Sequence, residues 1–335
     1  MIRPSLFMAS LLASCSSTIE LEENAPAHHR QDGTFVNSNG EAMTKPFSDL
    51  IKWQREAPDV TPINLPSVPP QLDTLANPSA AQLTWIGHST FLLQFDGLNI
   101  LTDPIFSERA SPVSFAGPKR TTPPAMTVEQ LPPIDVVLIS HNHYDHLDKP
   151  SVKALQAKQS DTPPRYYVPL GQKAWFDKLG ITKVTELDWW TSAKVGDATV
   201  HAVPVQHWSS RSPFDRNKAL WAGFVIDSPS LRTLFVGDSG YSDDFKAIAQ
   251  RLGKVDLALV PIGAYDPRWF MKSSHMNPEE ALLVVQDVGA KRAIGMHWGT
   301  FALTDEPMAE PGERAAATGV IETPKPGQTI DLSGI

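Results

Sequence analysis

The feature that most constrains this 335-residue chain is a cluster of metal-binding residue types directly after an apolar run. Residues 136–139 are Val-Val-Leu-Ile, which predicts a buried strand, and the cluster follows at once as His141, His143, Asp145 and His146. Histidines two residues apart in extended backbone point the same way and can bind one ion, while the Asp and His beyond them can reach a second. Imidazole and carboxylate suit zinc, so the segment predicts a zinc-binding loop at a strand end.

Three further ligand types stand where other apolar runs end. These residues are His207, Asp238 and His297, and each run lies far from the others in the sequence. Taken singly, each of these residues could equally be an ordinary polar residue at the end of a strand rather than a metal ligand. Together with the first four they complete seven ligands for two ions, and ligands at strand ends can meet at a shared sheet edge.

The charge and cysteine content of the chain exclude several classes of protein. The net charge is −8 and no basic run occurs, so a nucleic-acid partner has no electrostatic support. Cys15 is the one cysteine, which rules out an internal disulfide framework and a cysteine-rich zinc site. The sequence leaves a homodimer open.

Cys15 also stands where a bacterial lipoprotein signal would place its lipidated cysteine. A short charged start and an apolar run at residues 6–12 precede it, and that run is too short to span a bilayer. Residues 1–15 are therefore predicted to be a lipoprotein-type signal peptide. Ser16, rather than Asp, follows the cysteine and favours a periplasm-facing anchor in the outer membrane of the cell envelope. The alternative is an ordinary N-terminal extension on a cytoplasmic protein.

The remaining chain divides into a leading segment and one domain that contains the seven candidate ligands. Residues 16–80 are polar and rich in proline and predict a tether and wrapping segment, with one short helix near residues 46–53. Residues 81–335 interleave strand-like and helix-like runs with hairpin signals, such as Asp96-Gly97, in each half. This pattern predicts an α/β fold in which two mixed sheets pack face to face with helices outside.

The seven predicted ligands resemble the metal signature of the metallo-β-lactamase superfamily. Within this superfamily, eight longer runs resemble the N-acyl-phosphatidylethanolamine-hydrolysing phospholipase D family. They are residues 101–106, 117–120, 131–135, 186–190, 206–208, 261–265, 267–272 and 297–303. The resemblance extends from Leu83 to Glu306 and leaves the first 80 and the last 30 residues aside. It implies the αββα sandwich of the superfamily.

The resemblance also implies a site and a reaction. Two zinc ions per chain would be held, the first by His141, His143 and His207, the second by Asp145, His146 and His297, and both by Asp238. Hydroxide held between the ions would attack the phosphodiester of a phospholipid at a membrane surface, releasing N-acylethanolamine and phosphatidate. Asp145 would orient that hydroxide, or serve as a ligand alone.

Substrate contacts are predicted at two residues near this loop. His275 precedes a helix predicted to begin after Asn277, where it would donate a hydrogen bond to the phosphate; the alternative is a solvent-exposed residue. Tyr144, inside the ligand cluster, is expected to contact substrate. His88 is expected to support a ligand or the structure. Four apolar residues are predicted to line an acyl groove or to belong to the core: Trp208, Trp269, Phe270 and Met271.

Two other functions are compatible with parts of this pattern. A lactonase, or another metallo-β-lactamase-fold ester hydrolase acting on a soluble substrate, would use the same metal ions but cleave a different bond from the phospholipid phosphodiester. A lipoprotein with purely structural zinc is disfavoured, because structural sites use four closed ligands whereas seven suit an open binuclear site.

Overall fold

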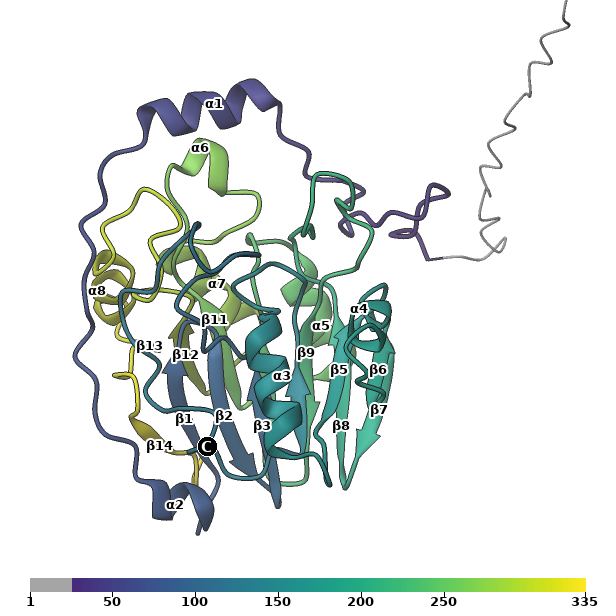
Figure 1. Ribbon diagram of the computed structural model, residues 1–335, viewed down its shortest axis with the longest axis vertical. Coiled ribbons are helices and arrows are strands. Elements are labelled where there is room, and N and C mark those ends of the chain that lie inside the picture. The colour runs from purple at the N-terminus through teal and green to yellow at the C-terminus, as the bar shows by residue number, and fades with distance from the viewer. Residues whose placement is uncertain (1–25) are drawn as a thin grey trace, which may run out of the picture.

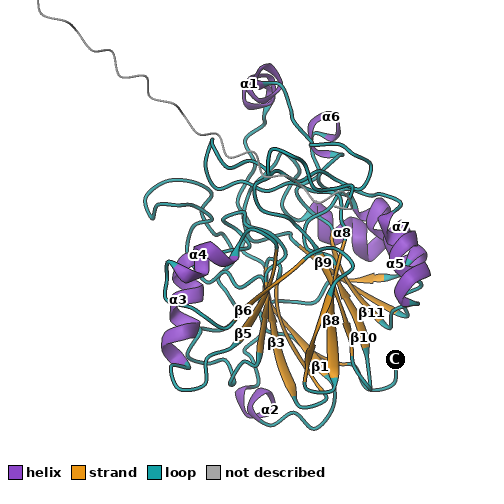
Figure 2. Ribbon diagram, turned by 90° about the vertical axis from the view of Figure 1, so that its right-hand side faces the viewer, coloured by secondary structure: helices purple, strands orange, loops and turns teal. Residues whose placement is uncertain are grey.

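Two seven-stranded sheets face each other, and helices cover their outer faces (Figure 1, Figure 2). The computed structural model describes residues 26–335, so the predicted signal peptide and Cys15 lie outside the described residues. Each sheet contains parallel and antiparallel pairs. The predicted α/β sandwich of two mixed sheets is confirmed.

The first sheet combines the start of the catalytic domain with the end of the chain. Its strands, in spatial order, are β14 (Thr329–Asp331), β1 (Gln82–Gly87), β2 (Thr90–Phe95), β3 (Leu98–Thr102), β4 (Val136–Leu138), β5 (Arg165–Pro169) and β6 (Val184–Leu187). The predicted hairpin joins β2 to β3 through Asp96 and Gly97, which both have positive φ, at 51° and 74°. A two-residue turn of this kind matches the twist of the strands it joins.

The second sheet contains the strands that precede His207, Asp238 and His297. In spatial order they are β13 (Ile321–Glu322), β12 (Arg292–Met296), β11 (Leu257–Pro261), β10 (Arg232–Phe235), β9 (Gly223–Asp227), β8 (Ala198–Val203) and β7 (Ser192–Val195). The neighbours from β10 to β13 pair in parallel, and β10, β11 and β12 are fully or largely buried. Burial on both faces explains why they appear in the sequence as continuous apolar runs.

Helices pack on the outer side of each sheet (Figure 2). They are α2 (Leu72–Ala76), α3 (Lys149–Lys158) and α4 (Lys173–Asp177) on the first sheet, and α5 (Asp244–Leu252), α7 (Pro278–Asp287) and α8 (Glu310–Ala317) on the second. Of these, α2 packs at the lower end of the first sheet (Figure 2). The start of α7 shows the predicted capping box: Asn277 accepts from the Glu280 amide, and the Glu280 side chain accepts from the Asn277 amide. No helix within residues 26–335 is long and apolar enough to cross a bilayer.

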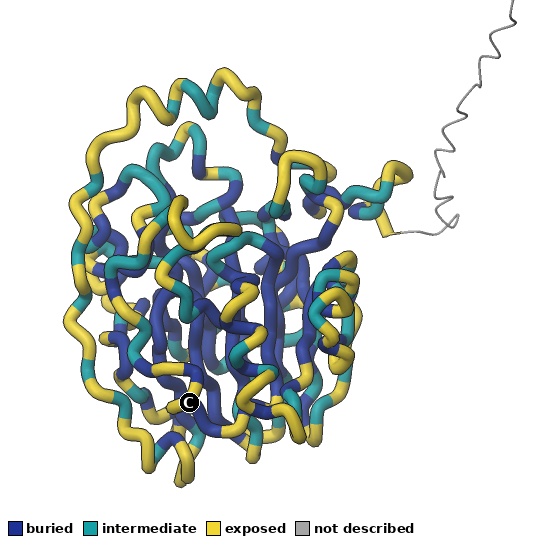
Figure 3. The backbone as a smooth tube through the Cα atoms, viewed as in Figure 1, coloured by how far each residue is buried: buried dark blue, intermediate teal, exposed yellow. Residues whose placement is uncertain are grey.

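Residues 26–80 wrap around the sandwich and reach the end where the loops gather (Figure 1). Their backbone is mostly exposed, in contrast to the buried strands (Figure 3). The predicted short helix is present as α1 (Phe47–Glu56), which lies beside α6 (Arg268–Met271). Trp53 stacks on Phe270 with ring centroids 5.1 Å apart, so α1 is packed against the domain by aromatic contact.

Candidate metal centre

The predicted ligands come together at one end of the sandwich, where four strands finish. Residues 141–146 follow β4 of the first sheet, and His207, Asp238 and His297 follow β8, β10 and β12 of the second. Gly237 allows the two sheets' loops to touch. It has φ of +68°, and a Cβ there would lie 2.5 Å from the Ser140 Cβ, so a side chain would push the loops apart.

The first group of ligand atoms belongs to three histidines. Nδ1 of His143 lies 2.8 Å from Nε2 of His141 and 3.3 Å from Nε2 of His207. The three nitrogens therefore converge on one small volume, as nitrogen ligands of a single ion must.

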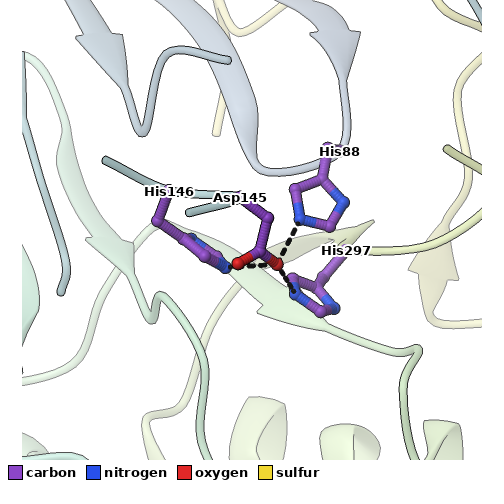
Figure 4. A group of neighbouring side chains, drawn as sticks. All are labelled: His88, Asp145, His146 and His297. Carbon is purple, nitrogen blue, oxygen red and sulfur yellow. Dashed lines mark hydrogen bonds and ion pairs between the residues drawn. The ribbon is translucent and has the colours of Figure 1, made fainter. Parts of the chain in front are cut away.

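The second group surrounds the Asp145 carboxylate (Figure 4). Its Oδ2 lies 3.0 Å from Nε2 of His88, 3.3 Å from Nε2 of His146 and 3.2 Å from Nε2 of His297. His88, expected to support a ligand, thus contacts Asp145 directly from the turn after β1.

Asp238 lies between the two groups. Its Oδ2 is 3.9 Å and 3.8 Å from Nε2 of His141 and His207, and 3.2 Å and 3.1 Å from Nε2 of His146 and His297. One carboxylate oxygen therefore faces both sets of histidines, which is the position required of a group shared by two ions.

Hydrogen bonds behind three of these histidines fix which nitrogen faces the centre. Nδ1 of His146 lies 2.6 Å from Oδ2 of Asp103, Nδ1 of His141 lies 2.9 Å from Oγ of Ser140, and Nδ1 of His207 lies 2.9 Å from the Ser274 carbonyl oxygen. A ring held at Nδ1 presents Nε2 inward.

Burial and neighbouring charges set the protonation of the cluster. Burial lowers the pKa of His143 and of His207 to about 3, so both imidazoles are neutral and keep a free lone pair. Burial disfavours the Asp238 carboxylate, but the facing His146 and His297 outweigh it and hold the pKa of Asp238 well below its usual range. Burial lowers the pKa of His146 and His297 as well, but the facing carboxylates outweigh it and raise the pKa of His297 to about 9 and that of His146 well above its usual range. His143, His207 and Asp238 are therefore already in the forms that bind metal, whereas His146 and His297 would release a proton on binding an ion.

A beta-lactamase superfamily domain matches residues 98–298, the stretch that contains all seven predicted ligands. The chain belongs to the metallo-β-lactamase superfamily. It is therefore a metal-dependent hydrolase by family. An N-acyl-phosphatidylethanolamine-hydrolyzing phospholipase D of Caenorhabditis elegans is 43% identical over 253 residues, covering 72% of this chain and 70% of that protein.

Two further proteins are similar to this chain. An uncharacterized protein of Mycobacterium tuberculosis is 38% identical over 341 aligned residues, covering 97% of this chain and 90% of that protein. A solved structure of a metallo hydrolase from Ignicoccus hospitalis matches with a TM-score of 0.58 and 22% identity, covering 76% of this chain and 99% of that chain. At that identity the match shows the fold alone.

The donor set fits the metal ions that this superfamily uses. Oδ1 of Asp238 is buried and has no hydrogen-bond partner among residues 26–335, and Nε2 of His146 is buried and meets carboxylate oxygens of Asp145 and Asp238 at 3.3 Å and 3.2 Å without a hydrogen bond to either. Buried polar atoms are almost always paired, so unpaired donors and acceptors that face one another are typical of a ligand shell. His141, His143 and His207 would hold one ion, Asp145, His146 and His297 the other, and Asp238 both.

A cavity of about 460 Å³ opens over this cluster. Its floor includes His143, Asp145, Asp238 and His297, and its walls include Trp208, Phe270, Met271, Phe47, Leu50 and Trp53. Trp269 is not among the lining residues and is 48% exposed, so three of the four predicted groove residues line the cavity.

The two predicted substrate-contact residues lie in different places. His275 lines the cavity over the cluster, with its Nδ1 3.9 Å from Oδ2 of Asp238. Tyr144 instead lines a neighbouring cavity, and its hydroxyl donates to the Arg211 carbonyl oxygen at 2.8 Å. The Tyr144 hydroxyl therefore helps to position the 211 loop in this structure and does not face the cluster.

Sequence reasoning overlooked two residues that hold ligands in place. Asp103 follows β3 and accepts from both the amide and the hydroxyl of Ser140, at 2.7 Å and 2.6 Å, besides its contact with His146. Asn37 clamps His207: its Oδ1 accepts from the His207 amide at 3.0 Å, and its Nδ2 donates to the His207 carbonyl at 3.0 Å. The polar end of β3 was a usable signal for Asp103, whereas Asn37 lies 170 residues from His207 and, beyond a weak family resemblance at residues 32–37, no pattern linked the two.

Replacing the buried Asp103 by Asn is expected to weaken metal binding by roughly 10- to 100-fold, the usual effect of removing the group behind a ligand. The amide keeps the shape of the side chain but loses the charge that orients His146. Competition with a chromophoric chelator measures the affinity. Asp135→Asn is the matched control, because Asp135 is an exposed carboxylate just before β4. Equal affinities in the two variants would contradict a supporting role for Asp103.

Proposed function

We propose that this protein is a binuclear zinc phosphodiesterase that hydrolyses N-acyl-phosphatidylethanolamine to N-acylethanolamine and phosphatidate. The observation that carries the proposal is Asp238, whose single oxygen faces two groups of histidines beneath a cavity with apolar walls. The phospholipase D relative from Caenorhabditis elegans supports the choice of substrate.

Two ions held by these ligands would supply a Lewis acid for the phosphoryl oxygens and would lower the pKa of water to about 7. The side chains of the protein position the attacking water and contact the phosphate. Asp145, held by His88 and His297, orients the attacking water. That water oxygen bonds to phosphorus, the bond from phosphorus to the ethanolamine oxygen breaks, and the alcohol oxygen leaves with a proton. His275 has no partner at Nδ1 within the described residues, so it can donate to a phosphate oxygen.

The cavity walls suit a lipid. Trp208, Phe270 and Met271 from the catalytic domain face Phe47 and Trp53 from the wrapping segment, and together they offer apolar surface to acyl chains beside the cluster. The wrapping segment thus belongs to the substrate site in this proposal.

The proposed location follows from the proposed substrate. A lipid on Cys15 would keep the enzyme at the periplasmic face of the outer membrane, next to its phospholipid substrate. The proposed reaction involves no nucleic-acid partner. Mass spectrometry of the mature N-terminus tests this. An N-terminal lipidated Cys15 supports the anchor, and an unprocessed Met1 ends that proposal in favour of a cytoplasmic protein.

The zinc-loaded protein should be assayed side by side on N-acyl-phosphatidylethanolamine, a simple phosphodiester and a homoserine lactone. We expect the first two to be hydrolysed, with N-acylethanolamine and phosphatidate identified by mass spectrometry from the lipid. Turnover of the lactone alone would reject the phospholipase and support a soluble-ester hydrolase. Free fatty acid from the lipid would show cleavage of a carboxylic ester or amide instead.

A further inference from the structure

Two cationic side chains stand in the wall of the cavity over the metal cluster. They are Lys45, which precedes α1, and Arg216, which lies in the loop between His207 and β9. Every other charged residue that lines this cavity is one of the predicted ligands or His275. The cavity therefore has its carboxylates at the floor and its fixed positive charge on one wall.

Neither cation forms an ion pair with a side chain of residues 26–335. Lys45 donates to the Phe270 carbonyl oxygen and lies 3.9 Å from the centre of the Phe270 ring. Arg216 donates to the Met43 carbonyl oxygen, and its guanidinium lies 4.2 Å from the centre of the Trp208 ring. Within residues 26–335 no carboxylate lies within ion-pairing distance of either head group, whereas ion pairs are formed elsewhere by Arg232, Arg268 and Arg314.

The pair is also partly removed from water. Both residues are half-buried, and Nε of Arg216 is buried without a hydrogen-bond partner in the described chain. Burial, together with the charge of Arg216, lowers the pKa of Lys45 to about 8. Two like charges held together with a donor left unpaired are unfavourable unless an anion joins them.

We propose that Lys45 and Arg216 form an anion-binding pair that holds the negatively charged phosphoryl oxygens of the substrate and of the phosphomonoester product. This inference rests on the proposed function and adds a specificity determinant to it. A carboxylic ester or a lactone is neutral and gains nothing from the pair. A phosphodiester carries one negative charge and its monoester product about −1.5 to −2, so the pair selects phosphoryl substrates. Arg216 offers a planar fork of donors, and Lys45 a point charge.

The test uses Lys45→Met, which keeps the apolar stem beside Phe270 and removes the charge. Lys52→Met is the matched control: Lys52 is an exposed lysine on α1 that lies 4.5 Å from the centre of the Trp269 ring and does not line the cavity. Each zinc-loaded protein is assayed on bis(p-nitrophenyl) phosphate and on neutral p-nitrophenyl acetate. Inorganic phosphate binding is measured in parallel by calorimetry.

A hydrogen bond to a charged group contributes about 1.5–3 kcal/mol, so Lys45→Met should lower the ratio of kcat/KM for the diester over the acetate by roughly tenfold or more. Phosphate affinity should fall by a similar factor, and Lys45→Arg should restore most of both. An equal loss on both substrates, or unchanged phosphate affinity, would overturn the inference. If the wild type binds phosphate through Lys45 yet cleaves neither the diester nor the phospholipid, the proposed function fails while the anion-binding pair stands.

Discussion

Asp238→Asn is expected to lower hydrolytic activity by roughly a thousandfold or more, because it removes the charged oxygen shared by both ligand groups. That oxygen lies within 3.9 Å of four histidine Nε2 atoms, and an amide of the same shape cannot offset two divalent charges. Metal analysis by inductively coupled plasma mass spectrometry should show fewer than two ions per chain, with catalytic rates measured on the same samples.

The control for this variant is Asp243→Asn. Asp243 is an exposed carboxylate near the same loop, and it pairs with Lys246 at the surface. It should keep wild-type metal content and activity. Asp238→Asn with intact activity and two ions would show that the centre does not depend on a shared carboxylate.

Trp221→Ala is expected to destabilise the protein by about 3–5 kcal/mol, the usual range for deleting a large buried aromatic side chain. Trp221 is fully buried, and its Nε1 donates to the Val205 carbonyl oxygen at 2.9 Å and lies 3.1 Å from Oδ1 of Asn37. The same Asn37 oxygen holds the His207 amide, so the variant should also bind metal more weakly.

Urea denaturation of the metal-free proteins measures the change in unfolding free energy. Phe214→Ala is the control, since Phe214 is 84% exposed and its removal should shift stability by no more than about 0.5 kcal/mol. A loss for Trp221→Ala as small as that of Phe214→Ala would mean that this region of the core does not support the site.

The sequence predicted the parts of the fold whose signals are local. Asp96-Gly97 requires positive φ at two positions, and Asn277 with Glu280 forms a reciprocal cap, so both could be recognised within a few residues. The buried strands before the ligand positions were recognisable as apolar runs. Because strand ends gather at a sheet edge, the seven residues could be expected to meet, and the structure brings them together.

The parts that were not predicted depend on distant partners. Strand β13 has two residues and exists because β12 lies beside it, and β14 returns from the end of the chain to pair with β1. Some residues of the site could not be predicted for the same reason. Lys45 and Asn37 lie in a proline-rich stretch without periodicity, and their roles come from contacts with Phe270 and His207, over 100 residues away.

The most direct test of the account is the number of zinc ions that the metal-free chain binds, measured by calorimetric titration and checked by mass spectrometry of the intact complex under native conditions. We expect two ions per chain, with hydrolysis of N-acyl-phosphatidylethanolamine returning as they bind. Saturation at one ion, or full activity of the metal-free chain, would contradict a binuclear centre built around Asp238.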